Sequence, residues 1–169
     1  MTPAKLRMIK QFKQQKHMSQ ELKQKITEYI SQTRWAILAT VREDKAPVLR
    51  AMGSFAPDGV DVYFSTPAAT AKVGQIGKNQ WVNFFFQHEG QELPTFKNVA
   101  VIGKAGEVKD AAELKKAIGL LSARNPRFKE RAEKGDLKDT AIFKIKSKEI
   151  KYLDFARGFG KEGIQELVL

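Results

Sequence analysis

The chain has 169 residues, of which 42% are hydrophobic, and it contains no cysteine. This length fits one domain with a sizeable core, so we expect a single domain over residues 1–169. The lack of cysteine excludes disulfides and thiolate metal sites, and it favours a cytoplasmic location. We expect neither a membrane segment nor a secretory leader, because no apolar run approaches ~18 residues and the lysine-rich start is polar.

The net charge of +11 is concentrated at the two flanks of the chain. Residues 1–34 carry +6 and residues 104–169 carry +5, whereas residues 35–103 have six basic and six acidic side chains and are neutral. A basic balance suits nucleic-acid binding, and it equally suits solvated helix faces that attract a small anion. Because no recognition motif accompanies the charge, a nucleic-acid partner is the less favoured interpretation.

The first part of the chain predicts a helix followed by three strands. Residues 1–17 are rich in Lys and Gln and could be a frayed or partner-packed helix, whereas Ser19 is a plausible N-cap of a helix that ends near residues 31–33. Residues 1–33 are therefore an N-terminal helical extension. Alternating patterns predict strands at 35–42, 47–55 and 60–65, with a turn at Pro57-Asp58-Gly59.

The rest of the chain predicts shorter elements in quick succession. A helix at 72–78 precedes a buried strand at 81–86, a polar loop at 88–95 and a strand at 98–105. Asp110 and Glu113 have capping-box spacing before a helix that Asn125-Pro126 stops. Residues 127–139 are irregular or briefly helical, and residues 141–145 and 149–155 form one long bent strand or two.

These elements predict a mainly β protein. Six or seven short strands joined by tight hairpins indicate an antiparallel β-barrel with an N-terminal helix and interposed helices. The helices do not alternate with the strands, which argues against a doubly wound parallel sheet.

The stretch from residue 62 to residue 72 carries the first functional signal. An apolar strand ends at Ser65 and Thr66, and a short connection leads through Thr70 to Lys72 at the start of a helix. Free backbone N–H groups and the helix dipole make such a junction a natural phosphate site. The alternative is a capped turn with a surface lysine.

Arg50 adds a second cation to this junction. It lies within an apolar strand, where a charge is costly unless an anion meets it. If the third strand runs antiparallel to the second, its Ser65–Thr66 end returns towards Arg50, and the cluster resembles a phosphomonoester site. The alternative is an exposed arginine on an edge strand.

The order of these elements resembles the pyridoxamine 5'-phosphate oxidase-like family of FMN-binding split β-barrels. The similarity runs from residue 35 to 105 and more loosely to residue 155. It is carried by Val48-Leu49-Arg50-Ala51-Met52, Tyr63-Phe64-Ser65-Thr66, Thr70-Ala71-Lys72 and the strand 98–105, which is similar to a "VxVxGxA" pattern of the family.

The resemblance implies a cofactor, a set of site residues and an assembly. Arg50, Ser65, Thr66, Thr70 and Lys72 would hold the phosphate and ribityl chain of FMN. The backbone of Ala51, Met52 and Gly53 would lie along the isoalloxazine ring, and Asn98 would touch the flavin from a second subunit. The protein would then be a homodimer with flavin at its interface.

Two departures from the oxidases narrow the expected function. Ala71 replaces an arginine that often precedes the helix lysine, and residues 152–157 lack the Trp and the Arg-Leu element of the true oxidases. The resemblance therefore implies a general flavin-dependent oxidoreductase acting on a small molecule, in which flavin supplies the redox chemistry and no catalytic residue is identified.

Several alternatives stay open at this point. A non-catalytic FMN carrier or sensor would share the fold, and relatives of this fold also bind F420 or haem, for which His88 is the candidate axial ligand. A basic nucleic-acid-binding module is a further alternative. His17 and His88 are the only histidines, too few and too far apart for a metal site.

Overall fold

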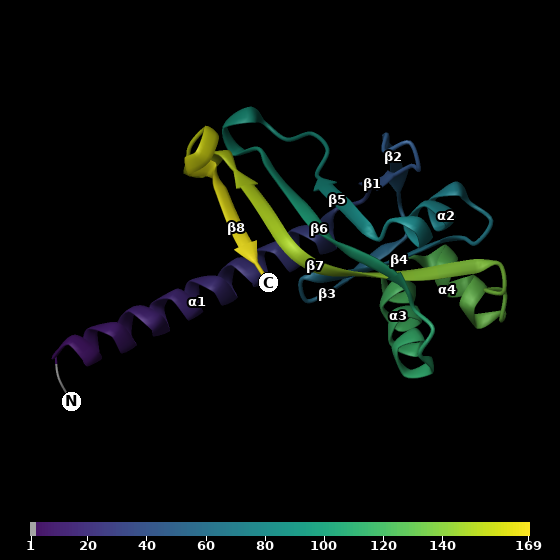
Figure 1. Cartoon of the computed structure of the whole chain (residues 1–169), viewed down its shortest axis with the longest axis horizontal. Coiled ribbons are helices and arrows are strands. Elements are labelled where there is room, and N and C mark those ends of the chain that lie inside the picture. Colours follow the sequence, from purple (N-terminus) through teal and green to yellow (C-terminus); the bar gives the residue numbers. More distant parts are fainter. Residues whose placement is uncertain (1–2) are drawn as a thin grey trace.

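The computed structural model describes the backbone of residues 3–169 and the side chains of residues 5–8 and 17–169. Its centre is an antiparallel sheet of eight strands that curls into a half-barrel (Figure 1). The strand order is β2-β1-β5-β6-β7-β4-β3, and β8 pairs with β7 beside this path. The predicted antiparallel split barrel is thus confirmed, with one strand more than expected.

The strands are β1 (Ala36–Val41), β2 (Pro47–Met52), β3 (Phe55–Asp58), β4 (Asp61–Pro67), β5 (Trp81–Gln87), β6 (Lys97–Glu107), β7 (Thr140–Asp154) and β8 (Ile164–Val168). The α-helices are α1 (Pro3–Gln32), α2 (Ala71–Lys78), α3 (Ala111–Arg124) and α4 (Pro126–Glu133). Short 3-10 turns are η1 (Leu93–Thr95), η2 (Phe155–Arg157) and η3 (Gly160–Gly163).

The long pairing of β6 with β7 joins the two parts of the sheet. Residues 140–145 of β7 pair with β4, residues 149–153 pair with β8, and β6 runs along both segments. The register shifts between Ile102 and Gly103, where a Cβ on residue 103 would lie 2.3 Å from the carbonyl oxygen of Lys146. Only glycine permits this approach, so the bend in the ladder depends on Gly103.

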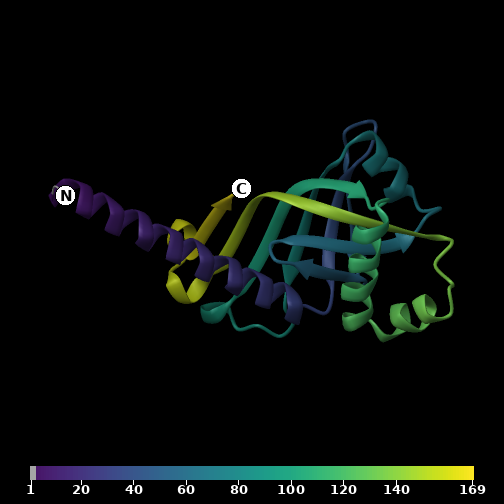
Figure 2. The ribbon, with the colours of Figure 1, turned by 90° about the horizontal axis from the view of Figure 1, so that it is seen from below.

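Two hydrophobic cores lie on opposite faces of the sheet. Inside the half-barrel, phenylalanine rings meet edge to face or stacked, and Ile26 and Ile30 of α1 are fully buried with them. On the other side, α3 lies over β3 and β4, with α4 beside it (Figure 2), and Leu121 of α3 and Phe128 of α4 pack with Tyr63. The rings of the first core belong to Phe55, Phe64, Phe84, Phe86 and Phe143.

The N-terminal helix is longer than predicted. It begins at Pro3, so Ser19 lies in its interior and the prediction of an N-cap there is wrong. Lys, Gln and Met are good helix formers, and they continue the helix without a cap. Only its C-terminal part packs against the barrel, and its N-terminal part projects beyond it (Figures 1 and 2).

Three further expectations can be compared with the structure. The strand predicted at 47–55 is interrupted at Gly53 and Ser54, giving β2 and β3, and β8 was not predicted. The N-cap at Asp110 is confirmed, because its Oδ1 accepts from the backbone N–H of Glu113. Residues 140–154 form one strand, as one of the two alternatives predicted. Within the described residues, no helix is long and apolar enough to cross a membrane.

Arg124 anchors the C-terminal end of α1 to α3. Its guanidinium donates to the carbonyl oxygens of Ile30 (2.9 Å) and Thr33 (2.8 Å) and lies 4.5 Å from the ring centroid of Phe55. Burial lowers the pKa of Arg124 from its usual value. The side chain therefore gives the Thr33 carbonyl a partner and the Ile30 carbonyl, which also accepts the backbone N–H of Thr33, a second donor.

We predict that Arg124→Ala lowers the free energy of unfolding by about 2–3 kcal/mol, because two charge-assisted hydrogen bonds are lost and the Thr33 carbonyl loses its partner. Urea denaturation followed by circular dichroism measures the change. Arg127→Ala, at an exposed position of α4, is the matched control and should change stability by less than about 0.5 kcal/mol. Equal stabilities of the two variants would contradict this role of Arg124.

Candidate functional site

A cluster of polar side chains lies where α2 meets the barrel. Lys72, in the first turn of α2, donates from Nζ to the Oγ1 atoms of Thr66 (2.7 Å) and Thr70 (3.2 Å). Thr66 is buried at the end of β4, and Thr70 is the N-cap residue of α2. The Thr70 hydroxyl makes no capping bond to the helix, so it is directed to the lysine and to the carbonyl of Pro67.

Arg50 lies in the same cluster and is held from two sides. Its Nη1 donates to Thr40 Oγ1 (2.8 Å), and its Nη2 donates to Gln75 Oε1 (3.0 Å). Thr40 in turn donates to the same Gln75 oxygen (2.6 Å). These three side chains, from β1, β2 and α2, form a closed ring of hydrogen bonds that fixes the guanidinium.

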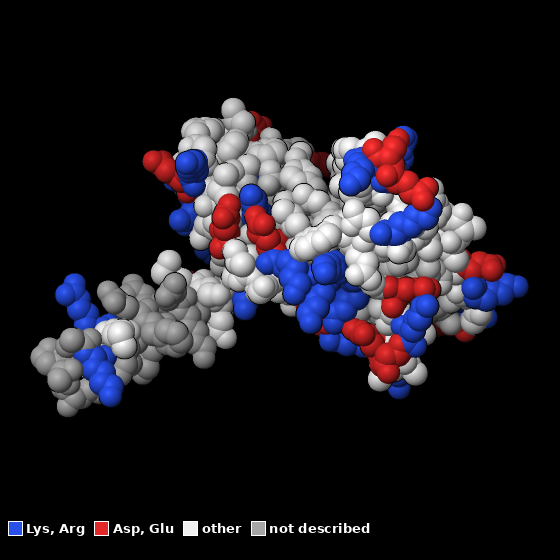
Figure 3. All heavy atoms as spheres, in the orientation of Figure 1, with Lys and Arg blue, Asp and Glu red and all other residues white. Residues whose placement is uncertain are grey.

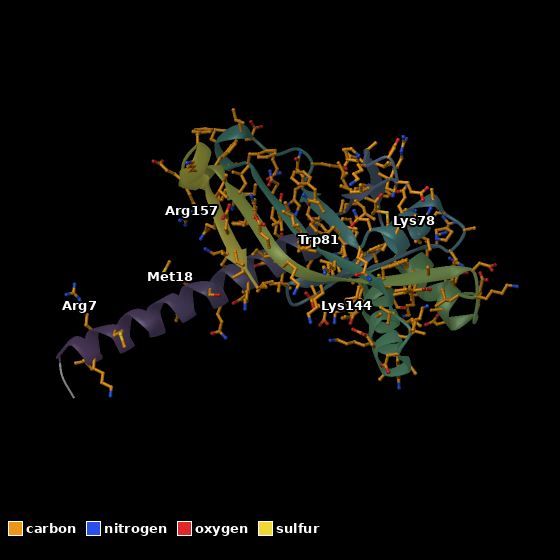
Figure 4. The ribbon with its side chains drawn as sticks, viewed as in Figure 1. Arg7, Met18, Lys78, Trp81, Lys144 and Arg157 are labelled. Carbon is orange, nitrogen blue, oxygen red and sulfur yellow. The ribbon has the colours of Figure 1, made fainter. Side chains whose placement is uncertain are left out.

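Both cations of the cluster are partly desolvated. Burial lowers the pKa of Arg50, and burial together with the nearby Arg50 charge lowers the pKa of Lys72. Neither cation forms an ion pair with a described carboxylate, whereas Lys144 on β7 pairs with Glu113 at 2.9 Å (Lys144 is labelled in Figure 4). Two desolvated cations without a counterion are suited to receive an anion.

The residues of this cluster are brought together by other elements than the strand pairing that we predicted. β4 pairs with β3, not with β2, so the third strand does not bring Ser65–Thr66 across from Arg50. Arg50 instead faces the barrel interior at its end, and α2 brings Lys72 and Gln75 over it. The predicted proximity of Arg50 to Lys72 holds through α2, whereas the predicted strand pairing is wrong and Ser65 does not join the two cations.

Two members of the cluster, Thr40 and Gln75, were missed by the sequence analysis. Thr40 lies at the third inward position of β1, after the buried Ala36 and Leu38. A hydroxyl at an inward position of an otherwise apolar strand indicates a polar contact inside the barrel, and the sequence alternation already showed it. Gln75 lies three residues after Lys72, and this spacing places the two side chains on the same face of a helix.

The other predicted site residues lie outside this cluster. Ser65 points to the opposite face of β4, where its hydroxyl bonds Ser54, and Met52 is buried in the core. Ala51 and Gly53 are exposed on the outer side of β2. Asn98 is half-buried on β6, and β1 and β5 lie between it and β2. One chain alone therefore does not bring Asn98 to Arg50.

Trp35 covers part of the predicted ring-binding backbone. A Cβ on residue 53 would lie 2.5 Å from Cζ3 of Trp35, so the indole ring rests directly on Gly53. The indole itself is half-exposed. A side chain at this position would displace the indole.

The histidine considered as a haem ligand is engaged within the protein. The His88 ring stacks on Tyr29 with centroids 3.8 Å apart, and its Nε2 lies 3.1 Å from the Tyr29 carbonyl oxygen. Among the described residues, no group of three or more His, Cys, Asp or Glu side chains could hold a metal ion.

A hollow of about 690 Å³ adjoins the cluster between the β1–β2 hairpin and α2. Gln75 lines it and thereby connects it to the ring of hydrogen bonds around Arg50. Lys78, labelled in Figure 4, lines its outer part and pairs with Glu43 of the hairpin.

The antiparallel split β-barrel and the cationic cluster under a short helix place this protein in the class of split-barrel proteins with a site suited to an anion. Residues 22–154 match the sequence model of the pyridoxamine 5'-phosphate oxidase family, and the chain belongs to that family. The resemblance seen in the sequence is thus confirmed. No curated protein sequence matches the chain.

Solved structures share the fold. General stress protein 26 from Bacillus anthracis is 25% identical, with a TM-score of 0.64 over 88% of this chain and 98% of that one. A protein related to general stress protein 26 from Clostridium acetobutylicum is 14% identical, with a TM-score of 0.65 over 89% and 96%. A haem-binding protein from Mycobacterium smegmatis is 12% identical, with a TM-score of 0.70 over 89% of this chain and 57% of that one.

The cluster leads to a prediction about stability. The pKa of Lys72 is lowered in the folded state, so the folded protein binds this proton more weakly than the unfolded chain does. We predict that Lys72→Met raises the thermal midpoint of the ligand-free protein at pH 7. The advantage over wild type should shrink as the pH rises through the lowered pKa, because the wild-type lysine then becomes neutral.

Lys78→Met, at the exposed end of the same helix, is the control and should not raise the midpoint. A lower midpoint for Lys72→Met than for Lys78→Met would show that the hydrogen bonds of Lys72 outweigh its desolvation, and would contradict the prediction.

Proposed function

We propose that the protein binds FMN and acts as a flavin-dependent oxidoreductase on a small molecule. The observation that carries this proposal is the adjacency of Arg50 and Lys72, both partly buried and neither paired with a described carboxylate. A phosphomonoester supplies the missing charge and accepts several hydrogen bonds at once. Membership of a family that usually binds flavin supports the same cofactor.

The residues present fit the phosphate end of FMN. Arg50 and Lys72 would bind the phosphate oxygens, and the hydroxyls of Thr66 and Thr70 would donate to them, next to the N-terminus of α2. The backbone at Ala51–Gly53 would face the flavin ring. When bound, the flavin would supply the redox chemistry, so the protein's task is to hold and orient it.

Oxidation of pyridoxamine phosphate itself is not the activity that we propose. Ala71 stands where the oxidases often have an arginine, so this cluster has one phosphate contact fewer. The C-terminal residues after β7 form η2, η3 and the edge strand β8, without the tryptophan and Arg-Leu element of the oxidases. We therefore propose a reductase of a different small molecule.

Haem and F420 are less well supported than FMN. The haem-binding neighbour from Mycobacterium smegmatis shares the fold at 12% identity. In this chain His88 is stacked on Tyr29 and bonded to its carbonyl, so it is not free as an axial ligand. The two cations favour a phosphate ester, which F420 and FMN both carry, and binding experiments distinguish them.

An apolar outer face of the sheet supports a homodimer. The outward residues of β2, β1, β5 and β6 lie in register and are mostly apolar. Leu49 is 67% exposed, Trp81 is 47% exposed and Ile37 is 42% exposed. Lys104 lies over the indole of Trp81, with its Nζ 5.5 Å from the ring centroid, and marks the edge of this face, where lysines and arginines gather below the place that Figure 4 labels Trp81 (Figure 3). Such a face favours association.

A second copy of this chain is the occupant that we propose for this face. Ala51 and Asn98, both predicted flavin contacts, lie on this outer side and are separated by two strands within one chain. A two-fold arrangement presents the same face from both copies, so Asn98 of one copy could meet the β2 backbone of the other. Two flavin sites at the interface would follow.

We predict that Arg50→Ala and Lys72→Ala each weaken FMN binding by about 1.5–3 kcal/mol, roughly 10- to 150-fold in Kd, through loss of charge-assisted hydrogen bonds. Quenching of flavin fluorescence measures the affinity. Lys78→Ala is the matched control and should bind like wild type. Unchanged affinity in both cluster variants would remove the site assignment, and failure of FMN to raise the thermal midpoint of wild type would remove the cofactor.

We also predict that Ile37→Asp converts the dimer into a monomer that remains folded. Ile37 lies opposite Ala51 and Phe85 on the outer face and is partly exposed in the single chain, so a carboxylate there opposes association more than folding. Sedimentation velocity measures the mass, and circular dichroism checks the fold. Ile164→Asp, at a similarly exposed position on β8, should stay dimeric. A dimeric Ile37→Asp variant would place the interface elsewhere.

A further inference from the structure

Gln75 occupies the position at which a single carboxylate would neutralise the cation cluster. Its Oε1 lies 3.0 Å from Nη2 of Arg50, and the residue follows Lys72 by three positions on α2. Side chains three residues apart on a helix are neighbours, so an acidic side chain at this position would lie within reach of both cations. The protein has a neutral amide there instead.

The amide of Gln75 has a defined orientation. A guanidinium carries donors and no acceptor, so the atom that faces Arg50 must be the amide oxygen. The same oxygen accepts from the Thr40 hydroxyl at 2.6 Å, which uses its second lone pair. Gln75 therefore holds Arg50 as a carboxylate would, through hydrogen bonds to an oxygen, without adding a negative charge.

The other contacts of the two cations are also uncharged. Thr66 and Thr70 meet Lys72 with hydroxyl groups, and Thr40 meets Arg50 with another. The eight residues of α2 include neither Asp nor Glu. Every hydrogen-bond partner that the described residues give to these two side chains is therefore neutral, and both positive charges are left to a ligand.

The carboxylates that line the adjoining hollow are engaged by other cations. Glu43 of the β1–β2 hairpin pairs with Lys78, and Asp44 pairs with Arg42. Arg42 also lowers the pKa of Asp44 to about 2, so this carboxyl is ionised and held within the hairpin. Neither acidic side chain of the hollow neutralises Arg50 or Lys72.

We propose that Gln75 is the specificity-determining residue of the cluster: its neutral amide fixes Arg50 and leaves two positive charges for a doubly charged phosphate monoester. This inference rests on the proposed function and deepens it. A ligand group with one negative charge, such as a carboxylate or a phosphate diester, would leave one cation without a counterion. A terminal phosphate carries a charge of about −1.5 to −2 at pH 7 and matches both.

Two substitutions of Gln75 distinguish charge from positioning. Gln75→Glu keeps an oxygen acceptor for Arg50 and adds a negative charge, whereas Gln75→Met removes the acceptor and stays neutral. We expect Gln75→Glu to weaken FMN binding by about 10- to 100-fold and Gln75→Met by less than about fivefold, measured by quenching of flavin fluorescence. A residue that only positions Arg50 would give the reverse order, and that result would overturn the inference.

The ligand-free variants supply a readout of the opposite sign. The introduced carboxylate gains two cationic neighbours, so Gln75→Glu should raise the thermal midpoint at pH 7 although it weakens binding. A lower midpoint than wild type would overturn the inference. Gln80→Glu is the control for net charge, at an exposed position just beyond α2 and outside the hollow, and it should bind FMN within about twofold of wild type. A loss as large as that of Gln75→Glu would also overturn the inference.

Inorganic phosphate separates this inference from the proposed function. If phosphate raises the thermal midpoint of wild type and FMN does not, the flavin proposal fails, and a weaker response of Gln75→Glu to phosphate still supports the role of Gln75. Equal responses of wild type and Gln75→Glu to phosphate would overturn that role. If neither phosphate nor FMN raises the wild-type midpoint, both proposals fail.

Discussion

The bend in the β6–β7 ladder is the constraint on which the architecture depends. Gly103 lets the backbone of β6 approach the Lys146 carbonyl, and the register shifts at that point. One continuous strand, β7, can then pair with β4 in its first segment and with β8 in its second. The first segment of β7 forms the side of the barrel where Thr66 lies, near the end of β4. The outer face of β1, β2, β5 and β6 stays uncovered by the chain's own helices (Figure 1).

The cation cluster opposes folding locally. Two like charges are held close together and partly desolvated: burial lowers the pKa of both groups, and the Arg50 charge lowers the pKa of Lys72 further. Several other lysines of the described chain pair with carboxylates, as Lys116 does with Asp58 at 2.6 Å. Local destabilisation of this kind is characteristic of sites that are organised for a ligand and supported by the rest of the fold. Here the support comes from the ring of Thr40, Arg50 and Gln75.

Much of the fold was predictable because alternation and turn chemistry are local properties. Most strands after residue 35, though not β8 or the break between β2 and β3, follow from them, as do the Asp110 cap and the helix stop at Asn125-Pro126. The prediction of the helix start was wrong because residues 3–18 are good helix formers, and a helix need not begin at a capping residue such as Ser19. The predicted pairing of β4 with β2 was wrong because Gly53 and Ser54 interrupt the second predicted strand. Short-range patterns also do not reveal that the sheet closes around an interior.

The two cations of the site could be predicted from the sequence, whereas the residues that hold them in place could not. Arg50 and Lys72 stand out in the sequence because a charge among apolar residues is costly unless it has a partner. Thr40 and Gln75 are ordinary residues whose roles appear only once α2 lies over β1 and β2.

The ring around Gln75 also has a consequence for dynamics. Helix α2 buries only Ile76, so side-chain hydrogen bonds to β1 and β2 contribute much of what holds it in place. An anion bridging Lys72 and Arg50 would add a further link between helix and sheet, and local opening of α2 would become rarer. The amide protons of this short helix would then exchange more slowly with solvent when the site is occupied, and their protection would report occupancy independently of any colour or turnover.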